Sequence, residues 1–249
     1  RVSRESRLPG LAEWGRVRDY RVLMLERMAN VSIYRENPLS ADEIFEFSAE
    51  DQFDYSHVLL ANGSSWRRNG LGRIHREPIP GLDKLKVFTP DDIMDGVLAK
   101  GRVVVFDDDH FYMGGVLAEK LRREGHDVLL VTPAPDISTW THKTLEQRKV
   151  QKQLMDLGVE LATQTNLTAA ETGKVELSCI FTERKIEREC DSLLLVTERI
   201  PNDGLFNSLN GDPERLTNAG IKTLKCIGDS FAPATIAAAV YSGHLAARE

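Results

Sequence analysis

The sequence predicts an α/β protein built from two interleaved Rossmann-like folds. Four short apolar runs are continuous rather than alternating, which is typical of parallel strands buried on both faces. These runs are residues 58–61, 103–106, 128–131 and 193–196. Between the second and third runs, Val116, Leu117 and Leu121 share one face of a predicted helix over residues 113–124, which Gly125 ends. This helix and its two flanking strands have the size of a βαβ unit.

The other predicted elements complete this pattern. In chain order they are a helix over 13–28, a strand over 30–34, a helix from 40 to 47, a helix over 143–157, a strand over 160–163, an antiparallel hairpin or meander over 174–190, a strand over 223–227 and a helix over 233–248. Ser40 and Glu43 form a capping box. We expect residues 1–80 plus 201–249 to form the first fold, incomplete at its N-terminus, and residues 81–200 to form a second, inserted fold.

Composition excludes several classes of function. With 41% hydrophobic and 28% charged residues, the chain is typical of a soluble globular protein. A formal net charge of −6 gives no electrostatic basis for binding nucleic acid or an anionic membrane. No apolar run approaches the roughly 20 residues that span a bilayer. The three cysteines lack zinc or iron–sulfur spacing, so we expect inert thiols in the cytoplasm and no metal ligands.

An acidic turn follows the second apolar run. Asp107, Asp108 and Asp109 stand where a dinucleotide fold places its glycine-rich phosphate loop, before the helix over 113–124. Two carboxylates about 5 Å apart repel by roughly 3 kcal/mol at an effective dielectric near 20, and a pyrophosphate would meet the same repulsion. We therefore predict that the second fold does not bind NAD(P), and that the carboxylates cap the following helix.

The same turn allows another interpretation. An apolar strand that ends in Asp-x-Asp resembles the nucleophile strand of haloacid-dehalogenase-type phosphatases, with Asp107 and Asp109 as the acidic pair. Residues 228–230 would then supply the later acidic motif that helps to hold Mg²⁺. Pro233 and Ala234 stand where that motif normally has a second acid.

Two other segments are candidates for nucleotide binding, and neither contains a predicted catalytic residue. The apolar strand that ends in Ala61-Asn62-Gly63 has small residues that let a nucleotide approach the backbone. The strand that ends in Gly228-Asp229 precedes a helix whose N-terminal donors suit a phosphate, and aspartate accepts hydrogen bonds from ribose or ribityl hydroxyls. The candidate cofactor-binding residues are Ala61, Asn62, Gly63, Ser64, Trp66, Gly228, Asp229, Thr235 and Ile236.

Taken together, these segments resemble the C-terminal half of the trimethylamine, dimethylamine and histamine dehydrogenase family, which is related to dienoyl-CoA reductase. The resemblance rests on residues 8–14, 60–63, 78–81, 106–115 and 228–244 and covers nearly the whole chain. It implies a flavoprotein oxidoreductase that oxidises a small amine and whose barrel, FMN, 4Fe-4S cluster and first glycine-rich loop lie outside this chain.

The resemblance also implies partners and a nucleotide. ADP or FAD would bind at the first fold, and the absence of the glycine-rich loop would weaken this binding. An electron-transferring flavoprotein or a similar carrier would accept electrons from a homodimeric enzyme. By itself the segment would be inactive. A non-catalytic structural or docking domain is the remaining alternative.

Overall fold

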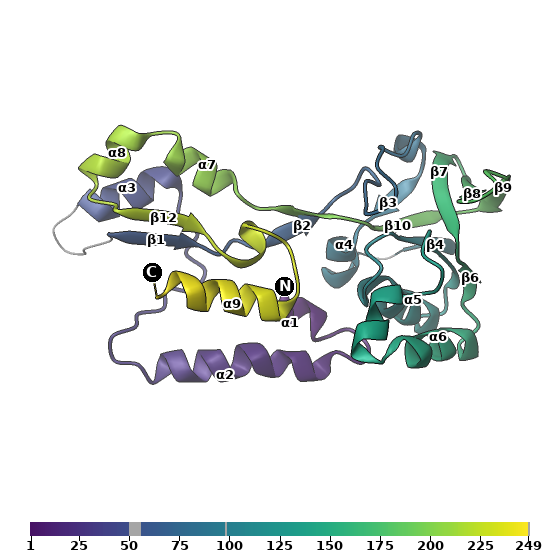
Figure 1. Cartoon of the computed structure of the whole chain (residues 1–249), viewed down its shortest axis with the longest axis horizontal. Helices are drawn as coiled ribbons and strands as arrows, with labels where there is room; N and C mark the ends of the chain where they lie inside the picture. The colour runs from purple at the N-terminus through teal and green to yellow at the C-terminus, as the bar shows by residue number, and fades with distance from the viewer. Residues whose placement is uncertain (50–55, 98, 249) are drawn as a thin grey trace. The chain divides into compact units, whose positions relative to one another are not determined.

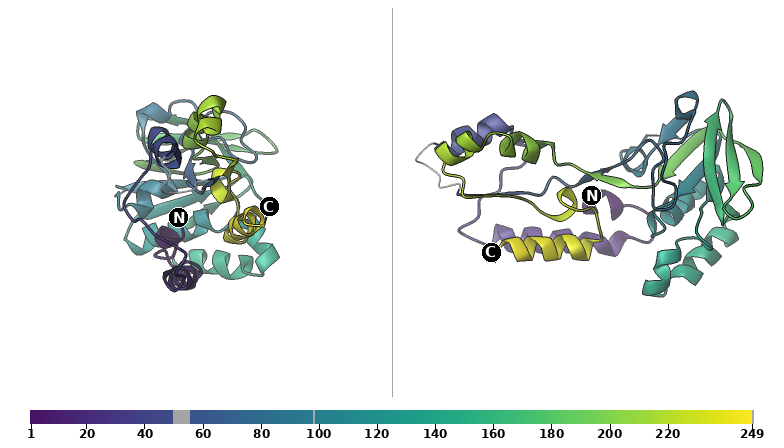
Figure 2. Two further views of the ribbon diagram at one scale, coloured as in Figure 1. Left: turned by 90° about the vertical axis from the view of Figure 1, so that its left-hand side faces the viewer. Right: turned by 45° about the horizontal axis from the view of Figure 1, so that its top comes forward.

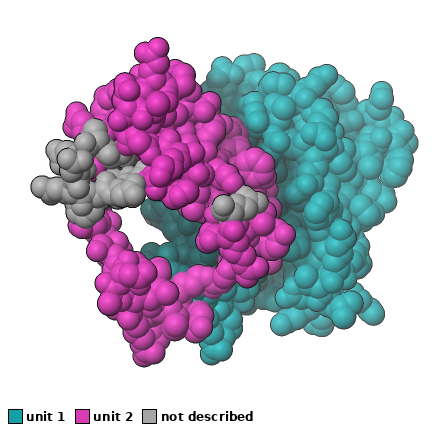
Figure 3. All heavy atoms as spheres, turned by 60° about the vertical axis from the view of Figure 1, so that its left-hand side comes forward, with its two compact units in different colours: residues 1–18, 66–198 teal, residues 19–65, 199–249 magenta. Residues whose placement is uncertain are grey.

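The computed structural model describes residues 1–49, 56–97 and 99–248, and these form two compact units. Unit 1 comprises residues 1–18 and 66–198, and unit 2 comprises residues 19–65 and 199–249 (Figure 3). The chain thus passes between units at residues 18/19, 65/66 and 198/199. We expected domain limits at 80/81 and 200/201, with residues 1–18 in the same domain as residues 19–65. The two domains expected from the sequence stay a prediction, because the division into compact units does not show whether either unit is a nucleotide-binding fold.

Unit 1 is organised around a five-stranded sheet in which all neighbouring strands are parallel (Figure 1). Its strands, in spatial order, are β3 (Lys86–Phe88), β10 (Ser192–Val196), β4 (Arg102–Asp107), β5 (Asp127–Val131) and β6 (Glu160–Ala162). All five residues of β10 are buried, as expected for a strand that is covered on both faces. The three apolar runs of this unit are therefore confirmed as parallel strands.

The two faces of this sheet have different coverings. On one face, α5 (Met113–Arg123) and α6 (Gln147–Asp156) pack on alternate strand residues that include Val103 and Val105. On the other face, a three-stranded antiparallel sheet packs on Val104 and Phe106. Its strands are β7 (Thr165–Glu171), β8 (Lys174–Cys179) and β9 (Lys185–Glu189). Figure 2 shows α6 and this antiparallel sheet on opposite sides of the parallel sheet.

Short elements complete unit 1. They are α1 (Val2–Glu5), η1 (Ala12–Trp14), η2 (Leu82–Lys84), α4 (Pro90–Met94) and η3 (Thr139–Thr144). The α1 segment is fixed by Glu5, which is fully buried and accepts hydrogen bonds from Arg1 at 2.7 Å and from the Tyr112 hydroxyl at 2.7 Å. The N-terminal residues are therefore part of the packed unit.

Unit 2 contains a parallel pair of strands, β1 (His57–Leu60) and β12 (Thr223–Cys226). Helices α3 (Ala41–Ala49), α7 (Gly204–Asn210) and α8 (Pro213–Asn218) form a small apolar core with these strands. The predicted capping box opens α3, since Ser40 N donates to Glu43 at 2.7 Å. The remaining elements are the long helices α2 (Gly15–Glu26), which begins in unit 1, and α9 (Ile236–Ala246), and the short paired strands β2 (Ser64–Trp66) and β11 (Arg199–Pro201).

The fold confirms a mixed α/β architecture with a parallel sheet, but several predicted elements were wrong. Residues 30–34 form no strand, because Ile33 and Tyr34 are 45% and 71% exposed and have no neighbouring strand. The final helix begins at Ile236 rather than Pro233, since Thr235 caps it. The helix expected from residue 143 begins at Gln147. Two interleaved Rossmann-like folds remain a prediction, because the described residues of unit 2 form paired strands and no larger sheet.

None of the helices within the described ranges is both long enough and apolar enough to cross a membrane.

The central sheet should dominate the stability of unit 1. Leu193→Ala, at a fully buried position of β10, should lower the free energy of unfolding by roughly 2–5 kcal/mol through lost burial and a cavity. Leu145→Ala is the control, because Leu145 is 91% exposed, and it should change stability by less than about 0.5 kcal/mol. Urea unfolding measures both, and equal effects would contradict the described core.

Candidate functional site

The acidic turn lies at the carboxyl end of β4, directly before the N-terminus of α5. Asp107 and Asp108 are fully buried, and Asp109 is 8% exposed. Asp107 accepts backbone hydrogen bonds from Asp109 N at 3.2 Å and His110 N at 3.0 Å. A side chain on Gly114, in the first turn of α5, would collide with Asp107, because its Cβ would lie 2.4 Å from the carboxyl carbon. The Asp107 carboxyl therefore fills the space at the helix start that a phosphate needs in a dinucleotide fold.

Burial and the neighbouring negative charge of Asp109 raise the pKa of Asp107 from its ordinary value of 3.8 to about 7. His110 and its backbone N–H lower this pKa, and Asp108 raises it further. The Asp107 Oδ2 atom has no hydrogen-bond partner among the described residues. This arrangement favours the protonated, neutral carboxyl.

Asp108 binds a different part of the chain. Its carboxylate accepts hydrogen bonds from Ile74 N at 3.0 Å and His75 N at 2.9 Å, and His110 Nε2 lies 2.9 Å from its Oδ1. Arg73 Nε donates to the backbone oxygen of Asp109 at 2.8 Å. The acidic turn is thus bound by residues 73–75 rather than open to solvent.

This geometry gives no support to the phosphatase alternative. An aspartate nucleophile must reach a phosphorus atom in solvent-accessible space, and Asp107 is 0% exposed. Its carboxyl lies against Gly114 and the backbone of its own turn. In the described ranges, no group of three or more histidine, cysteine or acidic side chains is arranged to hold a metal ion.

In unit 2, the structure brings Ser64 and Asp229 together. Ser64 Oγ donates to Asp229 Oδ2 at 3.3 Å, and Arg199 Nη1 donates to the same oxygen at 2.9 Å. Ala234 N donates to Asp229 Oδ1 at 3.1 Å. Both oxygens of the predicted ribose or ribityl acceptor therefore already have protein donors.

The small residues at the end of β1 are more accessible. Ala61 and Asn62 are exposed, and a Cβ on Gly63 would meet no atom within 4 Å. Glycine is favoured at position 63 by its backbone conformation, because its φ of +76° lies in the left-handed region. Asn202 donates from its backbone N to Gly63 O at 2.9 Å and from its side chain to Asn62 O at 3.2 Å. The backbone here is held in place while one side of it stays open.

The other predicted residues are placed as follows. Gly228 has a φ of +60° at the end of β12. The Thr235 side chain caps α9 by accepting from Ala238 N at 3.4 Å, directly before the partly buried Ile236. Trp66 belongs to unit 1, where its indole is buried in the core, so it does not join the other residues in unit 2.

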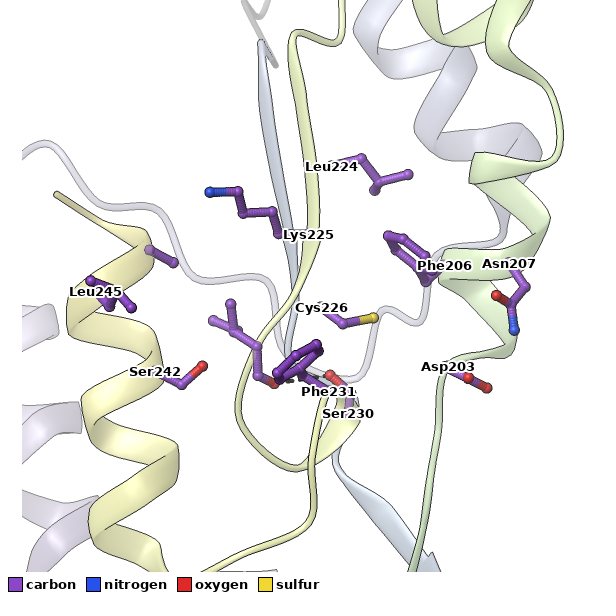
Figure 4. Close-up of a pocket in the computed structure, with 12 residues that line it drawn as sticks. Asp203, Phe206, Asn207, Leu224, Lys225, Cys226, Ser230, Phe231, Ser242 and Leu245 are labelled. Atoms are coloured by element: carbon purple, nitrogen blue, oxygen red, sulfur yellow. Dashed lines mark hydrogen bonds between the residues drawn. The ribbon is translucent and has the colours of Figure 1, made fainter. Parts of the chain in front are cut away.

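A pocket in unit 2 was not predicted from the sequence. It has a volume of about 500 Å³ and is open to solvent. Figure 4 shows Phe206 and Asn207 of α7, Leu224 and Cys226 of β12, and Leu245 of α9 around it. None of the nine predicted cofactor-binding residues lines it. The residues that line the pocket come from separate parts of the sequence, and only the fold brings them together.

Comparison with known proteins identifies relatives for the whole chain. Residues 88–192 match the family model for the OYE-like second alpha/beta domain. Dimethylamine dehydrogenase from Hyphomicrobium sp. (strain x) is 33% identical over 97% of the chain. The structure of histamine dehydrogenase from Rhizobium sp. 4-9 is 43% identical over 100% of the chain, with a TM-score of 0.95. The chain is homologous to part of these amine dehydrogenases.

A third relative agrees with this assignment. The structure of 6-hydroxypseudooxynicotine amine oxidase from Pseudomonas geniculata N1 is 40% identical over 98% of the chain, with a TM-score of 0.91. The chain spans just over a third of these relatives, namely 36% of the dimethylamine dehydrogenase, 38% of the histamine dehydrogenase and 35% of the amine oxidase. The resemblance to the amine dehydrogenase family is therefore confirmed.

The raised pKa of Asp107 predicts a pH dependence of stability. A carboxyl whose folded pKa exceeds its unfolded value contributes stability that is complete below the unfolded pKa, here 3.8, and is lost as pH rises through about 7. Asp107→Asn keeps the shape without the ionisation. Relative to this variant, the native chain should lose roughly 2–4 kcal/mol between about pH 4 and pH 8. Urea unfolding across this range measures the difference, and parallel pH profiles would contradict the prediction.

The buried ion pair Arg199–Asp229 should contribute more to stability than an exposed ion pair does. Its side chains are 11% and 8% exposed and lie 2.9 Å apart. Arg199→Met should cost roughly 3–5 kcal/mol, because it leaves a buried carboxylate without its counter-charge. Arg215→Met is the matched control: the Arg215–Asp42 pair is 45% and 73% exposed, and its loss should cost about 0–1 kcal/mol. Thermal unfolding compares the stability of the two variants. Equal losses of stability would show that the buried Arg199–Asp229 pair contributes no more than the exposed pair.

Proposed function

We propose that this chain is the nucleotide-fold region of a flavin- and iron–sulfur-dependent amine dehydrogenase. The observation that carries the proposal is the 43% identity to histamine dehydrogenase over the entire chain. Two further relatives, at 33% and 40% identity, also act on amines by name. The proposed reaction of the whole protein is oxidative N-dealkylation or deamination of a small amine.

Within this proposal, the amine chemistry takes place outside this chain. FMN would supply the two-electron oxidation and a 4Fe-4S cluster the onward electron transfer. Within its described residues, the chain has no group of three or more histidine, cysteine or acidic side chains that could hold a metal ion. An electron-transferring flavoprotein is the proposed acceptor, and a homodimer in the cytoplasm is the proposed state of the whole enzyme.

Unit 2 is the proposed site of ADP or FAD. The open backbone at Ala61–Gly63 offers close approach for a nucleotide beside Gly228, whose positive φ turns the chain at the end of β12. Asp229 contributes by positioning, since its carboxylate holds Arg199, Ser64 and Ala234 N. At the α9 N-terminus, Thr235 occupies one backbone donor by accepting from Ala238 N. The main phosphate loop implied by the resemblance lies outside this chain, so we expect weak binding by the chain alone.

A structural or docking role is the second candidate. It is favoured by the hydrogen bonds of Asp229 within the chain. Each carboxylate oxygen already accepts from a protein donor, so a ligand hydroxyl would have to compete for it. In that case unit 2 would bind no nucleotide. Direct binding measurements distinguish the two candidates.

The ADP proposal predicts a steric effect at Ala61. Calorimetric titration of the chain with ADP should show weak, saturable binding. Ala61→Leu should weaken it by about tenfold or more, because only a small side chain leaves room beside the strand end. Ala247→Leu is the control, because it changes an exposed alanine at the C-terminal end of α9. It should leave the affinity for ADP within about twofold of the native value.

Two outcomes would contradict this site. Undetectable binding to the native chain would favour the structural role. Equal affinity in the native chain and Ala61→Leu would show that ADP binds elsewhere.

A further inference from the structure

The parallel sheet of unit 1 has a topological switch point between β4 and β10. From β4 the chain continues to β5 and β6 on one side, whereas β10 and β3 lie on the other side. In open α/β sheets, ligands bind in the crevice outside the carboxyl ends of the strands at such a point. Here those carboxyl ends are Asp107 and Val196, which are register partners. Any ligand of this sheet is therefore expected beside the acidic turn.

A loop of the chain itself is bound at this position. Residues 69–79 form a closed loop, because Ile79 N donates to Asn69 O at 2.9 Å. Within the loop, Gly72 N donates to His75 O at 2.8 Å, which makes a tight turn. The backbone N–H groups of Ile74 and His75 then donate to the Asp108 carboxylate. The turn thus presents backbone donors to an anion, as phosphate-binding loops do, but the anion belongs to this chain.

Side chains fasten the loop on both flanks. The His75 ring packs edge-on against Phe106 of β4 at 6.3 Å, and its Nδ1 lies 3.0 Å from Asn166 Nδ2 of β7. Arg73 lies over the Trp140 ring at 4.4 Å. Trp140 belongs to η3, the segment that follows β5. The loop therefore bridges the end of β4 and elements from both sides of it.

No space remains between the loop and the acidic turn. Asp108 is fully buried, and Gly72 is buried as well. A Cβ built on Gly72 would lie 2.2 Å from Asp108 Oδ2. Gly72 has an ordinary backbone φ, so the close approach to Asp108, and not the turn geometry, requires glycine here.

We propose that residues 69–79 are a built-in strap that closes the switch-point crevice, and that the Asp108 carboxylate is its latch. The strap occupies the place of a ligand, so exclusion of a nucleotide from unit 1 rests on occupancy and not on negative charge alone. This inference concerns unit 1 and stands independently of the proposed nucleotide site in unit 2.

The latch is tested by two variants that act differently. Gly72→Ala keeps the charge of Asp108 but forces the loop away from it, and Asp108→Ala removes the acceptor. Both should speed hydrogen–deuterium exchange of the Ile74 and His75 amides by roughly 10- to 100-fold, the factor expected for a lost hydrogen bond to a charged group. Gly204→Ala is the control, since Gly204 also has an ordinary φ and has no atom within 4 Å of its Cβ position.

Exchange of the Leu129 and Leu130 amides in β5 shows whether the variants remain folded. If the Ile74 and His75 amides are unprotected in the native chain, the strap is not closed and the proposal fails. If Gly72→Ala leaves their protection unchanged while Asp108→Ala removes it, a close contact with Gly72 does not hold the strap, which also overturns the proposal.

Occupancy and charge are separated by titrating each variant with NADPH as a dinucleotide probe. Because NADPH contains an ADP moiety, every chain in this titration also carries Ala61→Leu, which blocks the proposed site of unit 2. The Ala61→Leu chain with the native strap should not bind NADPH, whereas both opened variants should bind it measurably. Binding to Asp108→Ala alone would show that charge excludes the ligand and would overturn occupancy as the cause. Binding to the Ala61→Leu chain with the native strap would overturn the proposal.

Discussion

The structure of unit 1 depends on how backbone N–H groups at the end of β4 find acceptors. In a dinucleotide fold, a bound phosphate accepts hydrogen bonds at this edge of the sheet. Here the chain supplies the acceptors itself: Asp107 accepts from the backbone of its own turn, and Asp108 accepts from Ile74 N and His75 N. The two successive acidic side chains therefore bind different segments: Asp107 binds the turn before α5, and Asp108 binds residues 74 and 75. The prediction that these side chains cap α5 is wrong for both of them, because neither accepts from a backbone N–H of that helix.

This substitution links the fold to the proposed role of the chain. With the proposed strap, residues of the chain itself fill the crevice at the end of the parallel sheet, so that unit 1 would need no bound nucleotide. This is consistent with a structural contribution to the proposed amine dehydrogenase. In unit 2, an aspartate is likewise hydrogen-bonded within the chain. Asp229 holds Arg199 and Ser64, while the backbone at Ala61–Gly63 stays open on one side. The proposed nucleotide therefore depends on close backbone approach more than on the aspartate.

Sequence reasoning succeeded where the signal is local. Continuous apolar runs identified β4, β5 and β10, because burial on both faces leaves no polar alternation. The capping box at Ser40 was equally readable. It failed for the last helix, where Pro233 is a plausible first residue but the Thr235 side chain makes the cap. The strand β7 was also missed, although it forms a local hairpin with β8 across the two-residue turn Thr172-Gly173.

The candidate sites show the same limit. Three successive aspartates predicted that a phosphate loop was replaced, but nothing in the sequence relates Asp108 to Ile74 and His75, more than 30 residues earlier. Trp66 follows the open strand end closely in sequence, yet its indole is buried in the core of unit 1. The unit 2 pocket draws on α7, β12 and α9 and has no sequence signature.

The most direct test of this account is a crystal structure of the chain grown with both ADP and NADPH. The account predicts density for ADP beside Ala61–Gly63, no dinucleotide at the carboxyl end of β4, and residues 69–79 bound to Asp108. Density for NADPH between β4 and β10, with the loop displaced, would contradict it.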